Sequence, residues 1–260
     1  MTNEEKIALF EKEIDYLNGD DFKEFVKRAI TLLPDYFFEV PASSSGQYHS
    51  ALESGFGGLV YHTKAVAKVA NYLVNLKQYR DALDSIAHAD CIITAALLHD
   101  CLKHNWENKT GFSVHEHPIL ASEFVKTDER LDDILEQTYR DIVGDAIASH
   151  SGEWTASKRS KTVLPSPQTL LQELVHLSDY IASRSDIHIL FEEGEAKPQL
   201  PDPNEYVLNF GKHSGKTLTY VFNHHRDYLD WCKENIKREP LISLIKQLEE
   251  QENHQEDDEI

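Results

Sequence analysis

Histidine and aspartate residues at the ends of apolar segments are the groups in this sequence with the clearest capacity for chemistry. The chain has 14 histidines among 260 residues. His99 and Asp100 stand together at the end of the apolar run AALLHD. Burying such a pair costs free energy unless something compensates, and a divalent cation is well suited to do so. The pair therefore indicates a metal site.

Four further residues have similar surroundings. His62 follows GGLVY, His117 begins HPILASEF, His150 ends DAIASH, and Asp179 lies within LVHLSDYIASR. With the His-Asp pair, they come from five separate predicted helices, which a helical bundle could bring together. One bridging carboxylate would let such a set hold two ions, which can bind a phosphoryl group and activate water. His115 is the alternative to His117.

Helical periodicity dominates the elements that must position these groups. The pattern predicts two helices within 3–33, and further helices at 59–76, 89–101, 115–127, 130–150 and 168–184. Segment 89–101 is almost wholly apolar, so we expect it at the centre of the fold. The fold class expected for residues 1–195 is all-α.

A second, smaller unit follows a linker. Residues 193–204 contain three prolines and several acidic residues, which is typical of a connecting segment. EYVLNFGKHSGKTLTYV then predicts a strand, a glycine turn and a further strand or helix start, before two helices at 225–236 and 240–251. We therefore expect a small α+β module at 204–250 and an acidic tail at 251–260.

Composition limits the partners. The formal net charge is −19, so the chain as a whole does not attract nucleic acid or an anionic membrane, and a polyanionic substrate needs a local positive feature. The most apolar stretch, Cys91–Leu98, falls far short of the roughly 20 residues that span a bilayer. The three cysteines form no CxxC pair, which fits a reducing compartment. We expect a cytoplasmic protein with no membrane partner.

The order H…HD…H…H…D resembles the HD superfamily of metal-dependent phosphohydrolases over about residues 40–190. GGLVYHT, ALLHDCLK, HEHPILASEF, ASHSGEW and LVHLSDYIASR are similar to that family's successive motifs. The resemblance implies an HD-domain helical bundle with two divalent metal ions (Mn, Fe, Ni, Co or Mg), Asp100 being the shared ligand. The ligands it implies are His62, His99, Asp100 and Asp179 for the first ion, and Asp100, His117 and His150 for the second.

The same resemblance suggests catalytic and substrate-binding groups. Lys103 stands at the family's usual lysine position after the His-Asp pair, where it would contact the phosphate or orient the water, so Asp100 and Lys103 are the expected catalytic residues. Arg184 and His49, with Lys103, are the expected substrate contacts. Cys101 and Leu102 depart from the Ile-Gly of many members, and the absent GYP signature argues against a cyclic-dinucleotide phosphodiesterase.

The segment FGKHSGKTLTYVFNHHRDYLDWC (210–232) resembles a small module at the C-terminus of exonuclease-X-like proteins. Lys212 and Lys216 flank its glycine turn and could grip a phosphate backbone. Tyr228, Leu229 and Trp231 match the module's second motif, and such residues are more often core than a base-stacking surface.

These features together predict an enzyme that hydrolyses a phosphoester of a nucleotide, or of a single-stranded nucleic-acid 3′ end, through metal-activated water. Phosphodiesterase, nucleotidase and 3′→5′ exonuclease activities are all compatible. Two alternatives remain: an HD-type di-iron oxygenase with the same ligands, and a non-catalytic regulatory protein that binds nucleotide or nucleic acid. The oligomeric state is left open, a homo-oligomer included.

Overall fold

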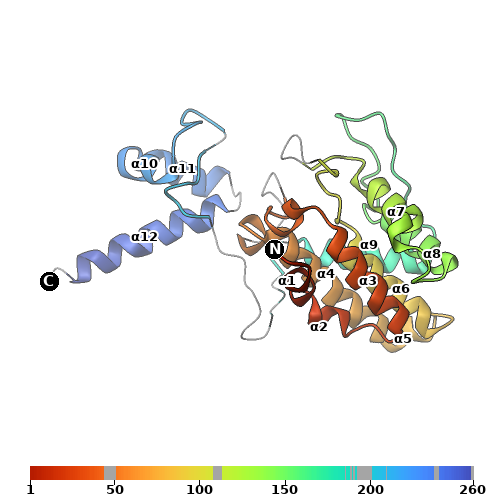
Figure 1. Cartoon of the computed structure of the whole chain (residues 1–260). Helices are drawn as coiled ribbons and strands as arrows, with labels where there is room; N and C mark the ends of the chain where they lie inside the picture. Colours follow the sequence, from red (N-terminus) through yellow and green to blue (C-terminus); the bar gives the residue numbers. More distant parts are fainter. Residues whose placement is uncertain are drawn as a thin grey trace.

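The computed structural model describes residues 1–43, 51–107, 113–184, 186–187, 189, 191, 201–208, 210–236 and 240–258. Within these ranges the chain is helical, as expected for its larger part (Figure 1). The helices before the linker are α1 (Asn3–Ala8), α2 (Glu11–Ile14), α3 (Asp20–Leu32), α4 (Gly58–Asn75), α5 (Lys77–Arg80), α6 (Ile86–Leu98), α7 (His117–Thr127), α8 (Gln137–Ala148) and α9 (Leu170–Ala182). Short 3₁₀ turns are η1 (Asp35–Phe38), η2 (Ala51–Ser54) and η3 (Glu129–Leu131).

Helix α6 is the central element of this bundle. Its residues from Asp90 to Leu98 are all buried, because the helix packs against α3, α4, α8 and α9 (Figure 1). Surrounding helices cover every face, so the near-continuous apolar sequence needs no polar stripe. The expected central position of this helix is confirmed. His99 and Asp100 follow its last residue, at the point where the chain leaves the core.

Local hydrogen bonds fix where the site-bearing helices begin. Ser85 caps α6 by accepting from the backbone amide of His88. Thr169 and Gln172 form a capping box at the start of α9. The buried carboxylate of Asp90 accepts hydrogen bonds from the backbone amides of Asn18 and Gly19, at 3.0 and 2.8 Å, which ties the start of α3 to α6.

The number of helices is predicted wrongly for two stretches of the chain. Residues 3–33 form three helices, not two. Residues 130–150 are divided between η3 and α8. The physical reason is the backbone of Asp133, whose φ of 61° is left-handed and cannot continue a right-handed helix.

The C-terminal unit has a hydrophobic cluster of its own, built on Leu208, Leu218, Leu229 and Leu241 with their neighbours. Its helices are α10 (Leu218–His224), α11 (Arg226–Asn235) and α12 (Leu241–Asp258). The α+β description is not confirmed: in the described part of this unit, strand pairing amounts to one antiparallel bridge between Val207 and Thr217. The chain between them turns through Gly211 and Gly215, both at positive φ, so little length remains for a ladder.

The described helices include none long and apolar enough to cross a membrane.

Candidate metal centre

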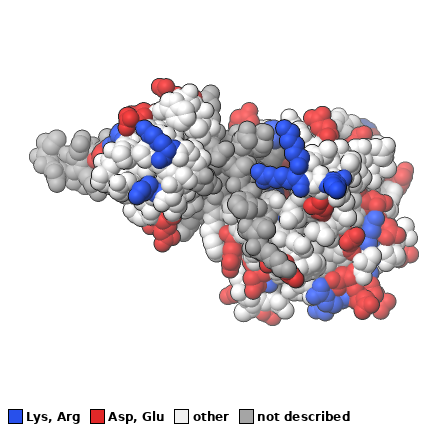
Figure 2. Space-filling model, turned by 90° about the horizontal axis from the view of Figure 1, so that it is seen from above, with Lys and Arg blue, Asp and Glu red and all other residues white. Residues whose placement is uncertain are grey.

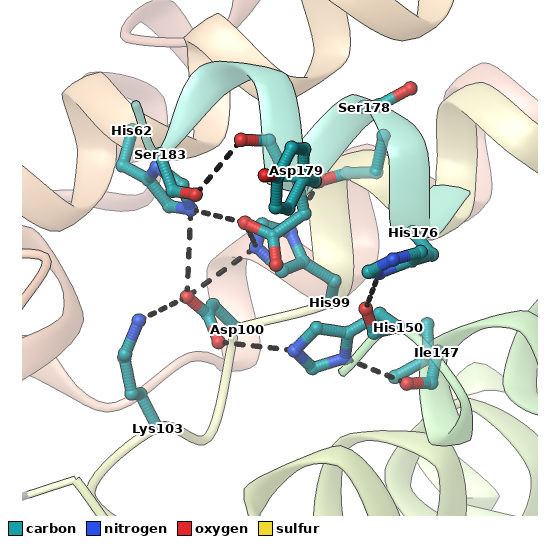
Figure 3. A network of polar contacts seen from close by, with 12 residues as sticks. His62, His99, Asp100, Lys103, Ile147, His150, His176, Ser178, Asp179 and Ser183 are labelled. Atoms are coloured by element: carbon teal, nitrogen blue, oxygen red, sulfur yellow. Dashed lines mark hydrogen bonds and ion pairs between the residues drawn. The ribbon is translucent and has the colours of Figure 1, made fainter. Parts of the chain in front are cut away.

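Asp100 lies at the middle of the cluster that the sequence predicted. Its side chain is 2% exposed. Its Oδ1 atom lies 3.0 Å from Nε2 of His117, and its Oδ2 atom lies 3.4 Å from Nε2 of His99 and 3.8 Å from Nε2 of His62. The two carboxylate oxygens thus face different histidines, and Figure 3 shows Asp100 with His62, His99, His150 and Asp179 pointing toward one another.

The donor atoms form two groups that share this carboxylate. His62, His99 and Asp100 make one group, and Asp100, His117 and His150 make the other; the donor atoms within each group all lie within 4.8 Å of one another. Asp179 stands beside the first group, with Oδ1 3.0 Å from Nε2 of His62 and 3.8 Å from Nε2 of His99. All six predicted ligands therefore meet at one place, brought there by α4, α6, α7, α8 and α9.

Backbone carbonyls orient three of the imidazole rings. In each case Nδ1 lies 2.7 to 2.8 Å from the carbonyl oxygen of the residue three positions earlier. Since a carbonyl oxygen is an acceptor, Nδ1 must carry the hydrogen, and Nε2 presents its lone pair to the centre. The three pairs are His99 with Ala96, His117 with Val114, and His150 with Ile147.

The fourth ring has a carboxylate in place of a carbonyl. Nδ1 of His62 lies 3.4 Å from Oε1 of Glu53, and both side chains are buried. Such a partner fixes the tautomer and ring orientation of a histidine and makes its other nitrogen a better donor to a metal. Sequence reasoning missed Glu53, since it sits in the short turn η2 without a motif around it.

The ionisable groups of this cluster shift one another's pKa values. Burial opposes protonation of His62, but its hydrogen bonds to Asp179 and Glu53 raise its pKa to about 9. Burial, together with the neighbouring imidazoles of His99 and His117, lowers the pKa of His150 to about 3. Burial alone would raise the pKa of Asp100, yet Lys103 and the neighbouring histidines hold that pKa well below its usual range.

The donor set fits divalent cations. The Nε2 lone pair of His117 faces a carboxylate oxygen of Asp100 at 3.0 Å and Nε2 of His150 at 3.3 Å, so acceptors face acceptors. Nε2 of His99 is buried without a hydrogen-bond partner among the described residues. Unless a positive charge is shared between them, such contacts are unfavourable. Mixed imidazole and carboxylate donors suit first-row transition metals.

A cavity of about 510 Å³ opens onto this centre. Lys103 lines it and places Nζ 2.5 Å from Oδ2 of Asp100. Arg184, two residues beyond the end of α9, lines it as well. Both predicted basic contacts therefore reach the pocket. His49 lies outside the described residues. The lining also includes His176, which the sequence suggested only as a surface, capping or supporting group, and Trp154 and Tyr180, which were not predicted as site residues.

His115, the alternative to His117, points elsewhere. Its Nε2 lies 3.1 Å from the carbonyl oxygen of Thr162. His104 stacks on Tyr36, with ring centroids 5.2 Å apart. His176 stands behind His150, with Nδ1 2.8 Å from the carbonyl oxygen of His150 (Figure 3). Two signals in the sequence could have placed His176 and Tyr180 at the site. They are four residues apart, so they share a helix face, and Tyr180 directly follows Asp179.

Two family models match the chain. Residues 59–184 match the HD domain family, and residues 208–237 match the family described as exodeoxyribonuclease X-like C-terminal. The chain carries an HD domain. No curated protein and no solved structure gives a significant match.

The HD domain runs from the first turn of α4 to Arg184, and it contains all six clustered His and Asp side chains. Glu53 precedes the matched range. An HD domain indicates a metal-dependent hydrolase, and the two groups around Asp100 could hold metal ions. The second match agrees with the resemblance of the C-terminal module to exonuclease-X-like proteins.

Proposed function

We propose that this protein is a dinuclear metal-dependent phosphohydrolase that cleaves a phosphoester of a nucleotide or of a nucleic-acid 3′ end. One observation carries the proposal: the two groups of donor atoms share Asp100. A shared carboxylate places two cations close to each other, which suits a phosphoryl group better than a single ion does. The proposed ligands are His62, His99, Asp100 and Asp179 for one ion, and Asp100, His117 and His150 for the other.

Two divalent ions bound there would supply an activated water and would neutralise charge that develops on the phosphoryl oxygens. The protein's own groups have separate tasks. The three backbone carbonyls and Glu53 hold the imidazole rings with Nε2 toward the centre. His62, His99, Asp100 and His150 are buried, so charge interactions among them are stronger than at the surface.

Lys103 and Arg184 would bind the substrate's phosphate. Lys103 is about nine-tenths buried and its ammonium group already contacts Asp100, so it would also orient that carboxylate. Arg184 is half-buried at the pocket, where a guanidinium can hold a phosphate through two hydrogen bonds. Catalysis would need no covalent intermediate on the protein.

Surface charge supports recognition of a short substrate segment. Acidic and basic side chains are interspersed on the face seen in Figure 2, and the described residues there form no continuous basic track. With a net charge of −19, the chain would repel a long polyanion except where Lys and Arg gather. A mononucleotide or one strand end fits these limits. The exonuclease-X-like match is the support for a nucleic acid.

The test is elemental analysis of the purified protein together with a substrate screen. Mononucleotides and labelled single-stranded DNA and RNA are offered with Mn²⁺, Co²⁺, Ni²⁺, Mg²⁺ or Fe²⁺. We expect about two metal ions per chain and release of phosphate or of a 3′-terminal nucleotide. Asp100→Ala is the matched inactive control.

Two results would overturn the proposal. A redox-active iron pair, detected by EPR and accompanied by O₂ consumption without hydrolysis, would assign the site to an oxygenase. Tight nucleotide binding with no turnover under any metal would assign it to a regulatory protein.

A further inference from the structure

A group of aromatic rings and one guanidinium lies at the mouth of the metal-centre cavity. The rings of Trp154 and Tyr180 are parallel to within 7°, with centroids 5.8 Å apart. The guanidinium carbon of Arg184 lies 4.4 Å from the centroid of the Tyr180 ring. All three residues line the cavity that Asp100 and Asp179 also line. We call Trp154 and Tyr180 the rim platform, and Arg184 lies beside it.

The rim platform presents open aromatic surface. Trp154 is 52% exposed and Tyr180 is 38% exposed. An exposed tryptophan alone needs no explanation. Here, however, two stacked rings and a cation border a pocket whose remaining walls are His, Asp, Lys and Ser side chains. A ligand that enters this pocket therefore meets a flat apolar surface at one part of it and charged groups at another.

The platform is anchored to the candidate metal centre. His176 packs against both aromatic rings, at centroid distances of 6.0 Å from Trp154 and 6.1 Å from Tyr180. The same imidazole bonds to the carbonyl oxygen of His150 through Nδ1. Gly152, with φ of 64°, turns the chain from His150 toward Trp154, and a side chain there would meet the ring of His176. Platform and centre are thus held in a fixed relation.

We propose that the rim platform binds an unpaired nucleobase by stacking, while Lys103 and Arg184 bind its attached phosphate. Aromatic side chains stack on any of the bases, because every base has a π face, and the affinity gained depends little on sequence. The cavity's volume of about 510 Å³ is in the range of small-ligand sites. A base inside a duplex has both faces covered by its stacked neighbours, so the site would require a base that is free of the stack.

This inference rests on the proposed function for the location of the phosphate. The ligand chemistry is a nucleoside phosphate with a free base, and it has two sources: a free mononucleotide, or the terminal nucleotide of a single strand. The experiment therefore uses both, each paired with a baseless analogue: deoxyribose 5-phosphate for the mononucleotide, and an oligonucleotide with an abasic terminal residue for the strand.

The first measurement is binding, by calorimetry on the metal-loaded protein with analogues whose scissile ester oxygen is replaced by a methylene group, so that no turnover occurs. Trp154→Ala removes the outer ring and Trp154→Phe retains a stacking surface. Tyr72→Ala removes an exposed aromatic of α4 that does not line the cavity, and it is the matched control. We expect Trp154→Ala to weaken binding of the base-bearing ligands about ten-fold or more, to leave the baseless ligands unchanged, and Trp154→Phe to recover most of the loss.

The second measurement is KM and kcat on the same pairs with metal present. The inference predicts that Trp154→Ala raises KM for base-bearing substrates and spares kcat for baseless ones. The arm with the larger effect identifies the source, mononucleotide or strand end. Equal losses of affinity for base-bearing and baseless ligands, or no loss with either, would overturn the stacking proposal. Base-dependent binding without hydrolysis would support the rim platform and refute the proposed hydrolase. Hydrolysis that does not depend on the base would support the hydrolase and refute the rim platform.

Discussion

Oε1 of Glu53 lies 3.4 Å from Nδ1 of His62, while Nε2 of the same ring lies 3.0 Å from Oδ1 of Asp179. One imidazole therefore spans two carboxylates, of which Glu53 is buried and Asp179 is partly exposed. Glu53 is outside the HD domain match, yet its contact with Nδ1 orients the ring so that Nε2 of His62 faces the candidate metal centre.

Glu53→Ala should weaken the first metal about 10- to 100-fold, the usual effect of losing a carboxylate behind a metal-binding histidine. Glu53→Gln should lose less, because an amide oxygen still accepts from Nδ1. Titration against a competing chelator measures both sites separately. Glu123→Ala, an exposed acid of α7, is the control. Equal weakening of both metals, or none, would refute the assigned role.

Asp100→Ala should remove both metals and all turnover, because its two oxygens face the two donor groups. His150→Ala should chiefly reduce the occupancy of the second metal. Metal content per chain, measured after gel filtration, distinguishes these outcomes. If Asp100→Ala keeps its full metal content, the shared-ligand assignment is wrong.

Lys103→Ala should lower kcat while metal content stays intact. The ammonium contacts Asp100 and borders the cavity, so it serves the phosphate and not the metal directly. A loss on the order of 100-fold is expected for removing a buried donor to a transition-state oxyanion. Lys126→Ala, whose lysine pairs with Asp145 on the surface, should leave kcat unchanged. Loss of metal in Lys103→Ala would contradict this separation of roles.

Gly152→Ala should destabilise the HD domain by about 2 kcal/mol, from left-handed backbone strain and overpacking. A Cβ at this position would lie 2.1 Å from Cε1 of His176. Gly215 also has positive φ but no atom within 4 Å of its Cβ position, so Gly215→Ala isolates the strain in the C-terminal unit. Urea denaturation gives the free energy of unfolding. A Gly152→Ala protein as stable as wild type would show that His176 moves aside freely.

Replacing both Lys212 and Lys216 by alanine should weaken single-stranded DNA binding and leave mononucleotide hydrolysis unchanged. Both side chains are exposed on the C-terminal unit, with their ammonium groups over Tyr228 and Tyr220 respectively. Losing two phosphate contacts should reduce the salt slope of log K by about 1.4. Fluorescence anisotropy at several salt concentrations measures it, with Lys27→Ala as control. An unchanged slope would remove this unit from nucleic-acid binding.

The sequence determined the helical class, the central position of α6 and the six residues that gather at the candidate metal centre. Apolar periodicity is local, and polar residues at the ends of apolar helices are costly enough to be visible without a structure. The wrong predictions from the sequence also have local causes. The interruption at Asp133 depends on one left-handed backbone conformation, and the expected strands near 206–220 had too little length between their turns to form a ladder.

Tertiary structure alone decided which groups support that cluster. Glu53 and His62 are nine residues apart in the chain, and Trp154 and Tyr180 are twenty-six apart, so no helical or strand period connects either pair. Only the structure shows that the ring of His117, at the start of α7, points toward Asp100, whereas the ring of His115 points toward Thr162. Such contacts follow from how helices pack, and packing is set by the whole core and not by any one segment.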